Sequence, residues 1–279
     1  MSGRLILCGT PIGNLEDCSP RVVRVLGESD VIACEDTRHT RKLLSHFGIR
    51  TRELVSYHEG NERRRTRDLV DRVAAGATVA VVSDAGMPGV SDPGYHLVRG
   101  CLARDLPVEV VPGPSAAMTA LVVSGLPPAR FVFEGFLPRK SGERRRHLEA
   151  LVEERRTLVF YESPHRVAAC LEDLHAVLGD RPAALCRELT KLYEEVRRGT
   201  LAELLESVRK EGPRGEIVLV VGGAVHEHRE APGAPELAAR ARALMASGVP
   251  RKEALAEVAE NAGVPKRAVF DALVETPES

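Results

Sequence analysis

The chain has 279 residues, of which 43% are hydrophobic and 28% are charged, and its formal net charge is -1. Because this length exceeds the usual size of one domain, we expect two or three units with separate cores. No stretch reaches the roughly 20 apolar residues that span a bilayer, and a strand pattern begins too early for a signal peptide. We therefore expect a cytoplasmic protein with no membrane partner, and the charge alone neither favours nor excludes a nucleic acid.

The cysteines and histidines indicate neither disulfides nor a metal centre. The six cysteines include no Cys-x-x-Cys pair, and three of them lie in apolar runs, so we expect free and mostly buried thiols. His226 and His228 form the closest histidine pair, but no neighbouring cysteine completes a zinc ligand set. We expect no metal requirement.

In the first half, short apolar runs alternate with helical patterns. Ser19 and Pro20 have the character of an N-cap and a first helical residue. Such alternation predicts βαβ units around a mostly parallel sheet. The expected strands are 5–8, 31–34, 54–57, 78–83 and 108–111, and the expected helices begin at Pro20 or span 38–47, 61–75 and 115–124.

Three of these strands run into loops rich in glycine and proline. We call them the first loop (residues 9–14), the second loop (84–89) and the third loop (112–115). In open α/β sheets ligands bind beyond the carboxyl ends of strands, so we expect the loops to wall one pocket. None carries a dinucleotide or nucleoside triphosphate motif, and proline removes amide donors, so the loops suit a neutral or cationic ligand better than a phosphate. The alternative is that glycine and proline only punctuate loops.

The second half predicts another α/β unit after a hinge at residues 126–128. Ser163 and Pro164 are expected to open one helix, and Thr200 with Glu203 matches a capping box. A cleft is expected between the two α/β units. The expected strands are 131–133, 158–161, 183–186 and 217–221.

The last part of the chain changes character after the linker 232–235. Three short helical patterns follow, the last at 266–273, with glycine-containing turns between them. They are typical of a helix-turn-helix that contacts nucleic acid, or of a small bundle used for packing or dimer contact. The predicted domains are an N-terminal α/β domain at 1–124, a second at 125–228 and a three-helix unit at 236–279.

Basic residues gather in three clusters. If these clusters face the pocket, they would attract a polymer of phosphates; otherwise they are solvated helix faces. The clusters are Arg38, His39, Arg41 and Lys42; Arg63, Arg64, Arg65 and Arg67; and Arg139, Lys140, Arg144, Arg145, Arg146 and His147.

Several short motifs follow one another along the chain. They are Thr10-Pro11-Ile12-Gly13-Asn14-Leu15, Glu35-Asp36-Thr37-Arg38, Ser83-Asp84-Ala85-Gly86, Asp92-Pro93-Gly94, Pro112-Gly113-Pro114-Ser115-Ala116, Phe160-Tyr161-Glu162-Ser163, Arg187-Glu188-Leu189-Thr190-Lys191 and Gly215-Glu216. In this order they resemble the tetrapyrrole-methylase superfamily, and within it the bacterial enzymes that methylate a cytidine 2′-hydroxyl at the decoding region of 16S ribosomal RNA. The resemblance runs from about Leu5 to Val221.

The resemblance implies two α/β domains that enclose S-adenosylmethionine in a cleft, a homodimer, and 16S rRNA or the small ribosomal subunit as partner. Two positions depart from the family pattern, which usually has Thr where this chain has Met87 and His where it has Gly60. The cofactor contacts that the resemblance implies are Pro11, Asp84, Gly86, Ser115, Ala116, Phe160, Tyr161, Leu189, Gly215 and Glu216.

Methyl transfer to a hydroxyl needs a proton acceptor, and a cation can stabilise the developing alkoxide. Glu35 and Asp36 could instead cap the next helix, His58 could be a polar strand end, and Lys191 could lie on the surface. The candidate acceptors are Glu35, Asp36, His58 and Glu62, and the candidate cations are Arg38 and Lys191.

Two rival functions remain open. A methyltransferase of the same fold that acts on a small corrin or porphyrin precursor would need no basic clusters at the cleft. A ligand-sensing DNA-binding regulator would need basic groups on its last helix, where Lys266 and Arg267 are the available ones.

Overall fold

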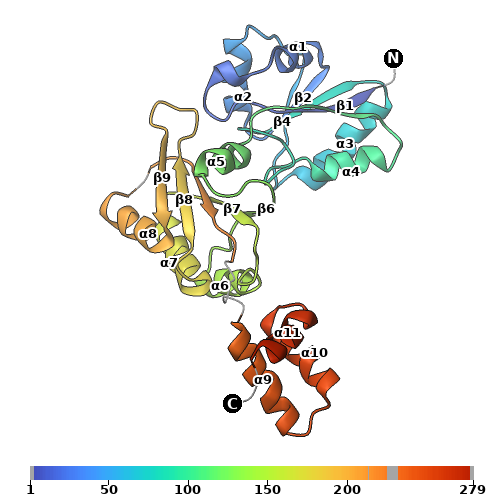
Figure 1. Ribbon diagram of the computed structural model, residues 1–279. Helices are drawn as coiled ribbons and strands as arrows, with labels where there is room; N and C mark the ends of the chain where they lie inside the picture. Colours follow the sequence, from blue (N-terminus) through green and yellow to red (C-terminus); the bar gives the residue numbers. More distant parts are fainter. Residues whose placement is uncertain (1–2, 213, 225–231, 277–279) are drawn as a thin grey trace. The chain divides into compact units, whose positions relative to one another are not determined.

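The structure is a computed structural model that describes residues 3–212, 214–224 and 232–276. The chain divides into two compact units, Met1–Ala224 and Val225–Ser279 (Figure 1). The first unit contains two five-stranded sheets, and the second contains helices. Two sheets, each covered by helices, together with a helical C-terminal unit agree with the fold class expected from the sequence. Among the described residues, no helix is long and apolar enough to cross a membrane.

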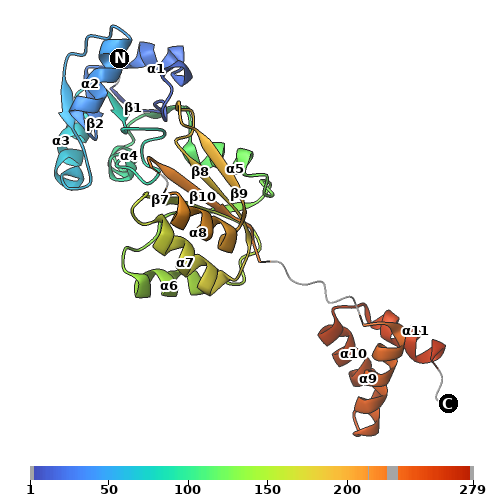
Figure 2. The ribbon, with the colours of Figure 1, turned by 90° about the vertical axis from the view of Figure 1, so that its left-hand side faces the viewer.

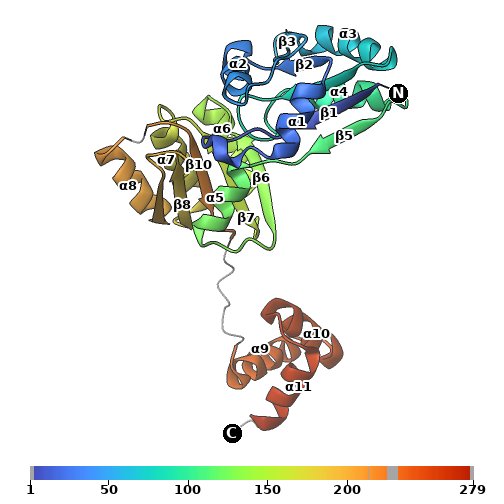
Figure 3. The same ribbon diagram turned by 90° about the horizontal axis from the view of Figure 1, so that it is seen from above.

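The first sheet is parallel throughout, in the order β3-β2-β4-β1-β5, so the carboxyl ends of its strands share one edge. Helices α1 and α2 pack on one face, and α3 and α4 pack on the other (Figure 3). Covering both faces explains why β2 is buried along its whole length and why β1 and β4 are buried after their first residue. The elements are β1 (Arg4–Cys8), α1 (Pro20–Glu28), β2 (Val31–Cys34), α2 (Thr37–His46), β3 (Leu54–Ser56), α3 (Glu62–Ala74), β4 (Thr78–Val82), α4 (Tyr95–Leu102) and β5 (Val108–Val111), with a 3-10 turn at Leu15–Asp17.

The second sheet is mixed, in the order β6-β7-β10-β8-β9, with β6 and β7 parallel and the other neighbours antiparallel. Helix α5 packs on one face, and α6, α7 and α8 pack on the other (Figure 2). Its elements are α5 (Ala116–Ser124), β6 (Phe131–Phe136), α6 (Ser141–Glu149), β7 (Thr157–Glu162), α7 (Val167–Leu178), β8 (Pro182–Arg187), β9 (Glu195–Thr200), α8 (Leu201–Lys210) and β10 (Ile217–Val221).

The predicted caps are confirmed, but one predicted helix start is wrong. The Ser19 hydroxyl accepts a hydrogen bond from an amide in the first turn of α1, and Thr200 and Glu203 bond reciprocally at the start of α8. Helix α7 begins at Val167 rather than at Ser163. The reason is that the Ser163 amide donates to the Glu162 carboxylate at 2.8 Å, and a turn precedes the helix.

Two elements of the first unit were not predicted. Helix α4 follows Gly94, whose φ of +150° places it outside the usual capping geometry. Strand β9 lies at the edge of the second sheet and carries Arg197 and Arg198, so its composition is not typical of a strand.

The second unit consists of α9 (Ala234–Ala246), α10 (Arg251–Ala262) and α11 (Lys266–Glu275). Leu237, Leu255 and Val269 contribute one residue from each helix to a shared core. Gly263 ends α10 at a φ of +65°, the left-handed conformation that glycine adopts without strain. The three helical patterns expected from the sequence are therefore present.

All six cysteines are free, and five of them are buried, as the sequence predicted. No cluster of three or more metal-ligating side chains occurs among the residues that the structure describes. The pair His226 and His228 lies outside those residues.

Candidate active site

The three glycine–proline loops meet at the carboxyl edge of the first sheet. They follow β1, β4 and β5, which are neighbours in the sheet order. Thr10 and Gly86 exchange backbone hydrogen bonds of 2.8 and 3.1 Å, which ties the first loop to the second. A Cβ atom on Gly9 would lie 2.6 Å from the Gly113 nitrogen, so only glycine permits this approach of the first strand end to the third loop. The convergence expected from the sequence is confirmed.

Beyond these loops lies a cavity of about 700 Å³. We call it the main cavity, and its size is suited to a drug-sized ligand. The first wall comes from the carboxyl edge of the first sheet, and the second wall comes from β6, β7 and β10. The lining residues are Ile12, Glu35, Asp84, Ala85, Gly86, Met87, Val90, Ser91, Asp92, Pro112, Gly113, Ser115, Ala116, Met118, Phe136, Tyr161, Glu162, Ser163, Pro164, Gly215, Glu216, Ile217 and Val218.

Acidic groups dominate the charge of the first wall. Glu35, Asp84 and Asp92 all line the main cavity. Burial raises the pKa of Glu35, and the negative charge of Asp84 adds to this effect. Burial raises the pKa of Asp92 to about 6, with further increases from the charges of Glu35 and Asp84, while a hydrogen bond with Ser83 opposes them.

The second wall presents an aromatic surface beside β7. The Tyr161 ring makes edge contacts with Phe133 and Phe136, with centroid distances of 5.0 and 5.5 Å. Burial raises the pKa of the Tyr161 hydroxyl, and the charges of Asp92 and Glu216 contribute to the increase. Asp92 and Tyr161 both line the main cavity.

A salt-bridged corner completes the second wall at Gly215 and Glu216. The Glu188 carboxylate accepts from the Glu216 amide at 3.0 Å and from Lys191 Nζ at 2.9 Å, and Lys191 also reaches Glu216 at 3.2 Å. A Cβ on Gly215 would lie 2.1 Å from Glu188 Oε1, so this carboxylate occupies the space that a side chain would need. Gly13 packs against Lys191 in the same way, which joins the first loop to this corner.

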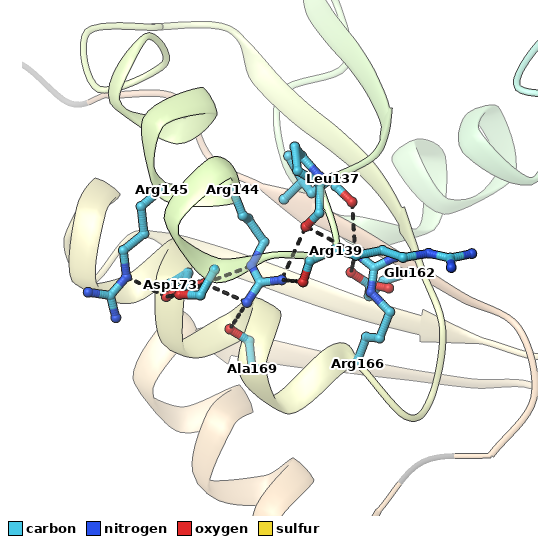
Figure 4. A network of polar contacts seen from close by, with 10 residues as sticks. Leu137, Arg139, Arg144, Arg145, Glu162, Arg166, Ala169 and Asp173 are labelled. Atoms are coloured by element: carbon cyan, nitrogen blue, oxygen red, sulfur yellow. Dashed lines mark hydrogen bonds and ion pairs between the residues drawn. The ribbon is translucent and has the colours of Figure 1, made fainter.

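A buried network of charges lies behind the second wall (Figure 4). The Glu162 side chain has no exposed surface, and it accepts from the Ser163 amide and pairs with Arg166 at 3.3 Å. Arg166 donates to the Leu137 carbonyl at 2.7 Å, directly after the cavity-lining Phe136. Glu162 Oε2 and Arg166 Nε have no hydrogen-bond partner.

The same network continues to Asp173 on α7. Arg144, only 3% exposed, donates to Asp173 at 2.7 Å and to the carbonyls of Pro138 and Arg139 at 3.2 Å (Figure 4). Burial tends to raise the pKa of Asp173, but hydrogen bonds from Arg145, Ser141 and Arg144 lower it overall. These contacts hold the segment that connects β6 to α6, which borders the second wall.

The main cavity gathers most of the cofactor contacts expected from the resemblance. Pro11 instead lines a smaller pocket of about 250 Å³, which shares Asp84 with the main cavity. Phe160 is fully buried in the core under α7, and Leu189 is 5% exposed in the core around α5. Neither of their side chains lines the main cavity. The residues that do line it are Asp84, Gly86, Ser115, Ala116, Tyr161, Gly215 and Glu216.

Among the candidate proton acceptors, only Glu35 lines the main cavity. Asp36 accepts from the Arg38 backbone amide and guanidinium, each at 2.7 Å, so it caps α2. The guanidinium beside it holds the pKa of Asp36 well below its usual range. The Glu62 carboxylate accepts hydrogen bonds from the Tyr57 hydroxyl at 3.0 Å and from the Gly94 amide at 3.1 Å.

The remaining candidates lie at the margins. His58 is exposed, and its charge lowers the pKa of Glu35, so it lies near the first wall without lining it. Arg38 is 85% exposed and paired with Asp36. Burial tends to lower the pKa of Lys191, but its hydrogen bond to Glu188 raises that pKa overall.

The basic clusters do not line the main cavity, whose lining residues include no lysine, arginine or histidine. His39 and Lys42 line the smaller pocket, while Arg63 and Arg64 line a separate one of about 610 Å³. Arg144 is buried in an ion pair with Asp173, so for this residue both expected alternatives, a basic group at the pocket and a solvated helix face, are wrong.

Sequence reasoning missed two acidic residues of the site. Asp92 and Glu162 were only parts of motifs, although both are among the residues that line the main cavity. The Glu162 side chain itself has no exposed surface. Asp92 follows Val90 and Ser91 in a loop with no periodicity, so no local pattern marks it. The signal for Glu162 was available, because an acidic residue directly after an apolar strand is costly to bury without a partner.

The fold and this cavity define a class of proteins. Residues 4–205 match the family of Tetrapyrrole (Corrin/Porphyrin) Methylases, and the chain belongs to that family. A solved structure of uroporphyrin-III C-methyltransferase from Thermus thermophilus, complexed with S-adenyl homocysteine, has the same fold. It superposes with a TM-score of 0.55 at 22% identity, over 79% of this chain and 97% of the other.

Within that family, relatives of nearly equal length narrow the assignment. A protein of Mycobacterium tuberculosis named Ribosomal RNA small subunit methyltransferase I is 49% identical over 278 residues, which is 99% of this chain and 96% of the relative. The Thermotoga maritima protein of the same name is 46% identical over 221 residues, 79% of this chain and 99% of the relative. The Thermotoga maritima relative is therefore about as long as the first unit of this chain.

Proposed function

We propose that this chain transfers the methyl group of S-adenosylmethionine to the 2′-hydroxyl of a cytidine ribose at the decoding region of 16S ribosomal RNA. The observation that carries the chemistry is the main cavity, where three loops without a phosphate-binding motif surround a group of carboxylates. The names and the 46–49% identity of the relatives support the RNA substrate.

The residues of the main cavity fit this methyl donor. It supplies a positively charged sulfonium, and the carboxylates of Glu35, Asp84 and Asp92 are complementary to that charge. Met87, Met118, Phe136 and Tyr161 provide apolar and aromatic surface. Among the described residues, no lysine, arginine or histidine lines the cavity to repel the donor.

The chain would accelerate the transfer mainly by alignment. The glycine–proline loops allow backbone atoms to approach the donor closely, and the two walls limit its orientation. We assign donor contacts to Asp84, Gly86, Ser115, Ala116, Tyr161, Gly215 and Glu216. Pro11 remains a candidate through the smaller pocket, and Phe160 and Leu189 remain candidates only through their backbone atoms.

The hydroxyl must also lose its proton. Glu35 remains a candidate acceptor by its position in the main cavity. Asp36, His58 and Glu62 would have to act from outside the cavity wall, and Arg38 or Lys191 would supply a cation only at its margin. For these five residues the sequence-based assignment stays a prediction.

A second candidate is methyl transfer to a small tetrapyrrole. The absence of basic side chains from the wall of the main cavity is the observation in its favour. The solved uroporphyrin-III methyltransferase shares the fold at only 22% identity, whereas the relatives named for ribosomal RNA share more than twice that identity.

The deciding experiment incubates the full chain and labelled S-adenosylmethionine with small ribosomal subunits that lack the modification. We expect label on one cytidine ribose, located by nuclease digestion and mass spectrometry. Naked 16S rRNA in a parallel reaction shows whether the assembled subunit is required. Label only on a base, or only on an added uroporphyrin, would contradict the proposed substrate.

We further infer a cytoplasmic homodimer, which sedimentation of the purified chain tests. The proposed domains are residues 1–124, residues 125–228 and the helical unit at 236–279. That unit would serve in RNA contact or in packing.

A further inference from the structure

The carboxylates of the main cavity differ in how much of their hydrogen-bonding capacity the protein already uses. The Asp84 carboxylate accepts a hydrogen bond from the Asp36 amide at 3.1 Å. The Glu35 carboxylate accepts a hydrogen bond from the backbone amide of Asp84. These two residues brace one another across the ends of β2 and β4. Their carboxylates are therefore part of the wall that holds the loops.

The acidic groups of the second wall are also occupied. Glu162 is buried against Arg166 and the Ser163 amide. Glu216 pairs with Lys191 at 3.2 Å and is 71% exposed, so solvent competes for it. Each of these carboxylates already pairs with a cation of the protein.

Asp92 stands apart from this group. It lines the main cavity, is half-buried, and its polar contact is with the Ser83 side chain. Glu35 and Asp84 from the first sheet and Tyr161 from the second line the same cavity as Asp92, and no lysine, arginine or histidine is among the described residues that line it. A carboxylate that lines the cavity can accept a hydrogen bond from an incoming hydroxyl group.

The backbone holds Asp92 in a tight loop. Ser91 has a φ of +62°, a conformation that non-glycine residues adopt rarely. A Cβ atom added to Gly135 in β6 would lie 3.2 Å from the Ser91 Oγ, so this loop packs closely against β6. The Gly89 amide donates to the Pro93 carbonyl at 3.1 Å, which closes the loop around Asp92. Such backbone strain is typical of functional sites, where the surrounding structure over-determines the conformation.

We propose that the Asp92 carboxylate is the proton acceptor for the attacking hydroxyl, an assignment that rests on the proposed methyl transfer. The hydroxyl O–H bond breaks and its proton moves to Asp92. The oxygen forms a bond to the methyl carbon, and the carbon–sulfur bond breaks with its electron pair remaining on sulfur. The sulfonium becomes a neutral thioether, and the carboxylate becomes a neutral acid.

The electrostatics agree with this role. A general base is most effective when its pKa lies near the working pH. The pKa of Asp92, raised to about 6, leaves the group ionised at neutral pH while making it more basic than an exposed aspartate. Glu35 serves as a positioning residue that keeps Asp92 basic through its negative charge.

The test compares Asp92→Asn with the full wild-type chain in the labelled small-subunit assay. We expect kcat to fall by about 10²-fold or more, which is typical for loss of a general base. Binding of S-adenosylhomocysteine, which carries no positive sulfur, should stay within threefold of wild type by calorimetry. Asp92→Glu should recover part of the activity, because it restores a carboxylate.

The pH dependence separates a base from a structural residue. In wild type, log kcat should rise with pH up to about 6 and then level off, and this limb should be absent from the residual activity of Asp92→Asn. Carbon NMR of labelled aspartate carboxyls, assigned by the signal missing from Asp92→Asn, should show one carboxyl that titrates near pH 6. Asp105→Asn, at an exposed turn with a φ of +52° that asparagine tolerates, is the matched control and should behave as wild type.

Three outcomes would overturn the assignment. They are kcat of Asp92→Asn within threefold of wild type, loss of S-adenosylhomocysteine binding equal to the loss of activity, and an unchanged acidic limb. In each case the wild-type chain still labels the ribose, so the proposed function survives without Asp92. If the wild-type chain transfers no label to RNA, the proposed function fails and this assignment fails with it.

Discussion

The two walls of the main cavity are held in place by different forces. In the first wall, the first loop approaches the third so closely that an added Cβ on Gly9 would lie 2.6 Å from a backbone nitrogen. In the second wall, buried charges support the surface, with Arg144 and Asp173 each 3% exposed at the side chain. Backbone approach leaves no room for an added atom, while a buried ion pair does not tolerate the loss of one partner.

The two walls therefore differ in what their acidic residues do: those of the first wall are placed to bind a ligand, and those of the second wall support the structure. No lysine, arginine or histidine is among the described residues that line the main cavity, so Glu35, Asp84 and Asp92 remain available to a positively charged ligand. The acidic residues behind and beside the second wall are paired, with Arg166, Arg144 or Lys191. We therefore expect substitutions in the two walls to have different signatures in stability and in donor binding.

The largest expected effect is loss of a buried charge. Asp173→Ala would leave Arg144 buried without its partner and should lower the free energy of unfolding by about 3–5 kcal/mol. Thermal and urea denaturation measure the change. The control is the neighbouring Glu172→Ala, whose exposed pair with Arg209 contributes about 0–1 kcal/mol. Equal losses for the two variants would mean that buried charge does not support the second wall.

An added methyl group in the first wall should have the next largest effect. Gly9→Ala would push against the backbone of Gly113 and should cost about 1–3 kcal/mol of stability through overpacking. Because the loops would separate, S-adenosylmethionine binding by calorimetry should weaken at least tenfold. Gly27→Ala, whose nearest neighbouring atom is 4.0 Å away, should leave both unchanged or slightly improved. Normal donor binding by Gly9→Ala would contradict the importance of this close approach.

Removing the charge of Asp92 should stabilise the protein. The pKa of Asp92 is raised from 3.8 to about 6 on folding, so the folded state binds more protons than the unfolded state within this range. Its contribution is fully present below about pH 4 and is lost as the pH rises through about 6. Asp92→Asn should therefore be more stable than wild type at pH 7, by roughly 2 kcal/mol, and the gain should disappear near pH 4.

Denaturation of both proteins at pH 4, 5, 6 and 7 checks this expectation. The control is Asp105→Asn, whose exposed carboxyl should produce no such trend. A variant that is less stable than wild type at every pH would show that Asp92 supports the loop more than the loop disfavours its charge. That result would weaken the contrast between a wall that binds and a wall that supports.

The smallest expected effect comes from the partly exposed corner of the second wall. Lys191→Met removes the links to Glu188 and Glu216 and should cost at most about 1 kcal/mol of stability. Donor affinity should fall about threefold to tenfold, because Gly215 and Glu216 lose their anchor. Lys210→Met, which breaks an exposed pair with Glu206, is the matched control and should leave donor affinity unchanged. Wild-type affinity in Lys191→Met would show that this corner does not shape the main cavity.

Much of the first sheet was predictable from local pattern. Each apolar run between turn residues became a parallel strand, because a strand covered by helices on both faces is apolar along its length. The caps at Ser19 and Thr200 were also predictable, since a cap depends on residues only a few positions apart.

The second sheet was harder to predict. Strand β9 is polar because it lies at the edge, and the early part of α7 is replaced by a turn that the buried Glu162 carboxylate anchors. Charged residues that resemble a solvated helix face in the sequence include Arg144, which is buried in the structure. Composition cannot distinguish these cases, because the partner of Arg144 is Asp173, 29 positions away.

Spacing and residue type alone were enough to indicate an α/β protein whose glycine–proline loops meet at one sheet edge, because parallel strands place their carboxyl ends together. Tertiary packing decided which carboxylates line the cavity and which form salt bridges with arginine or lysine. The contact between Thr10 and Gly86 spans 76 positions, and the one between Asn14 and Thr190 spans 176. Contacts of this range depend on strand order and on how the two sheets pack, which no local window of sequence contains.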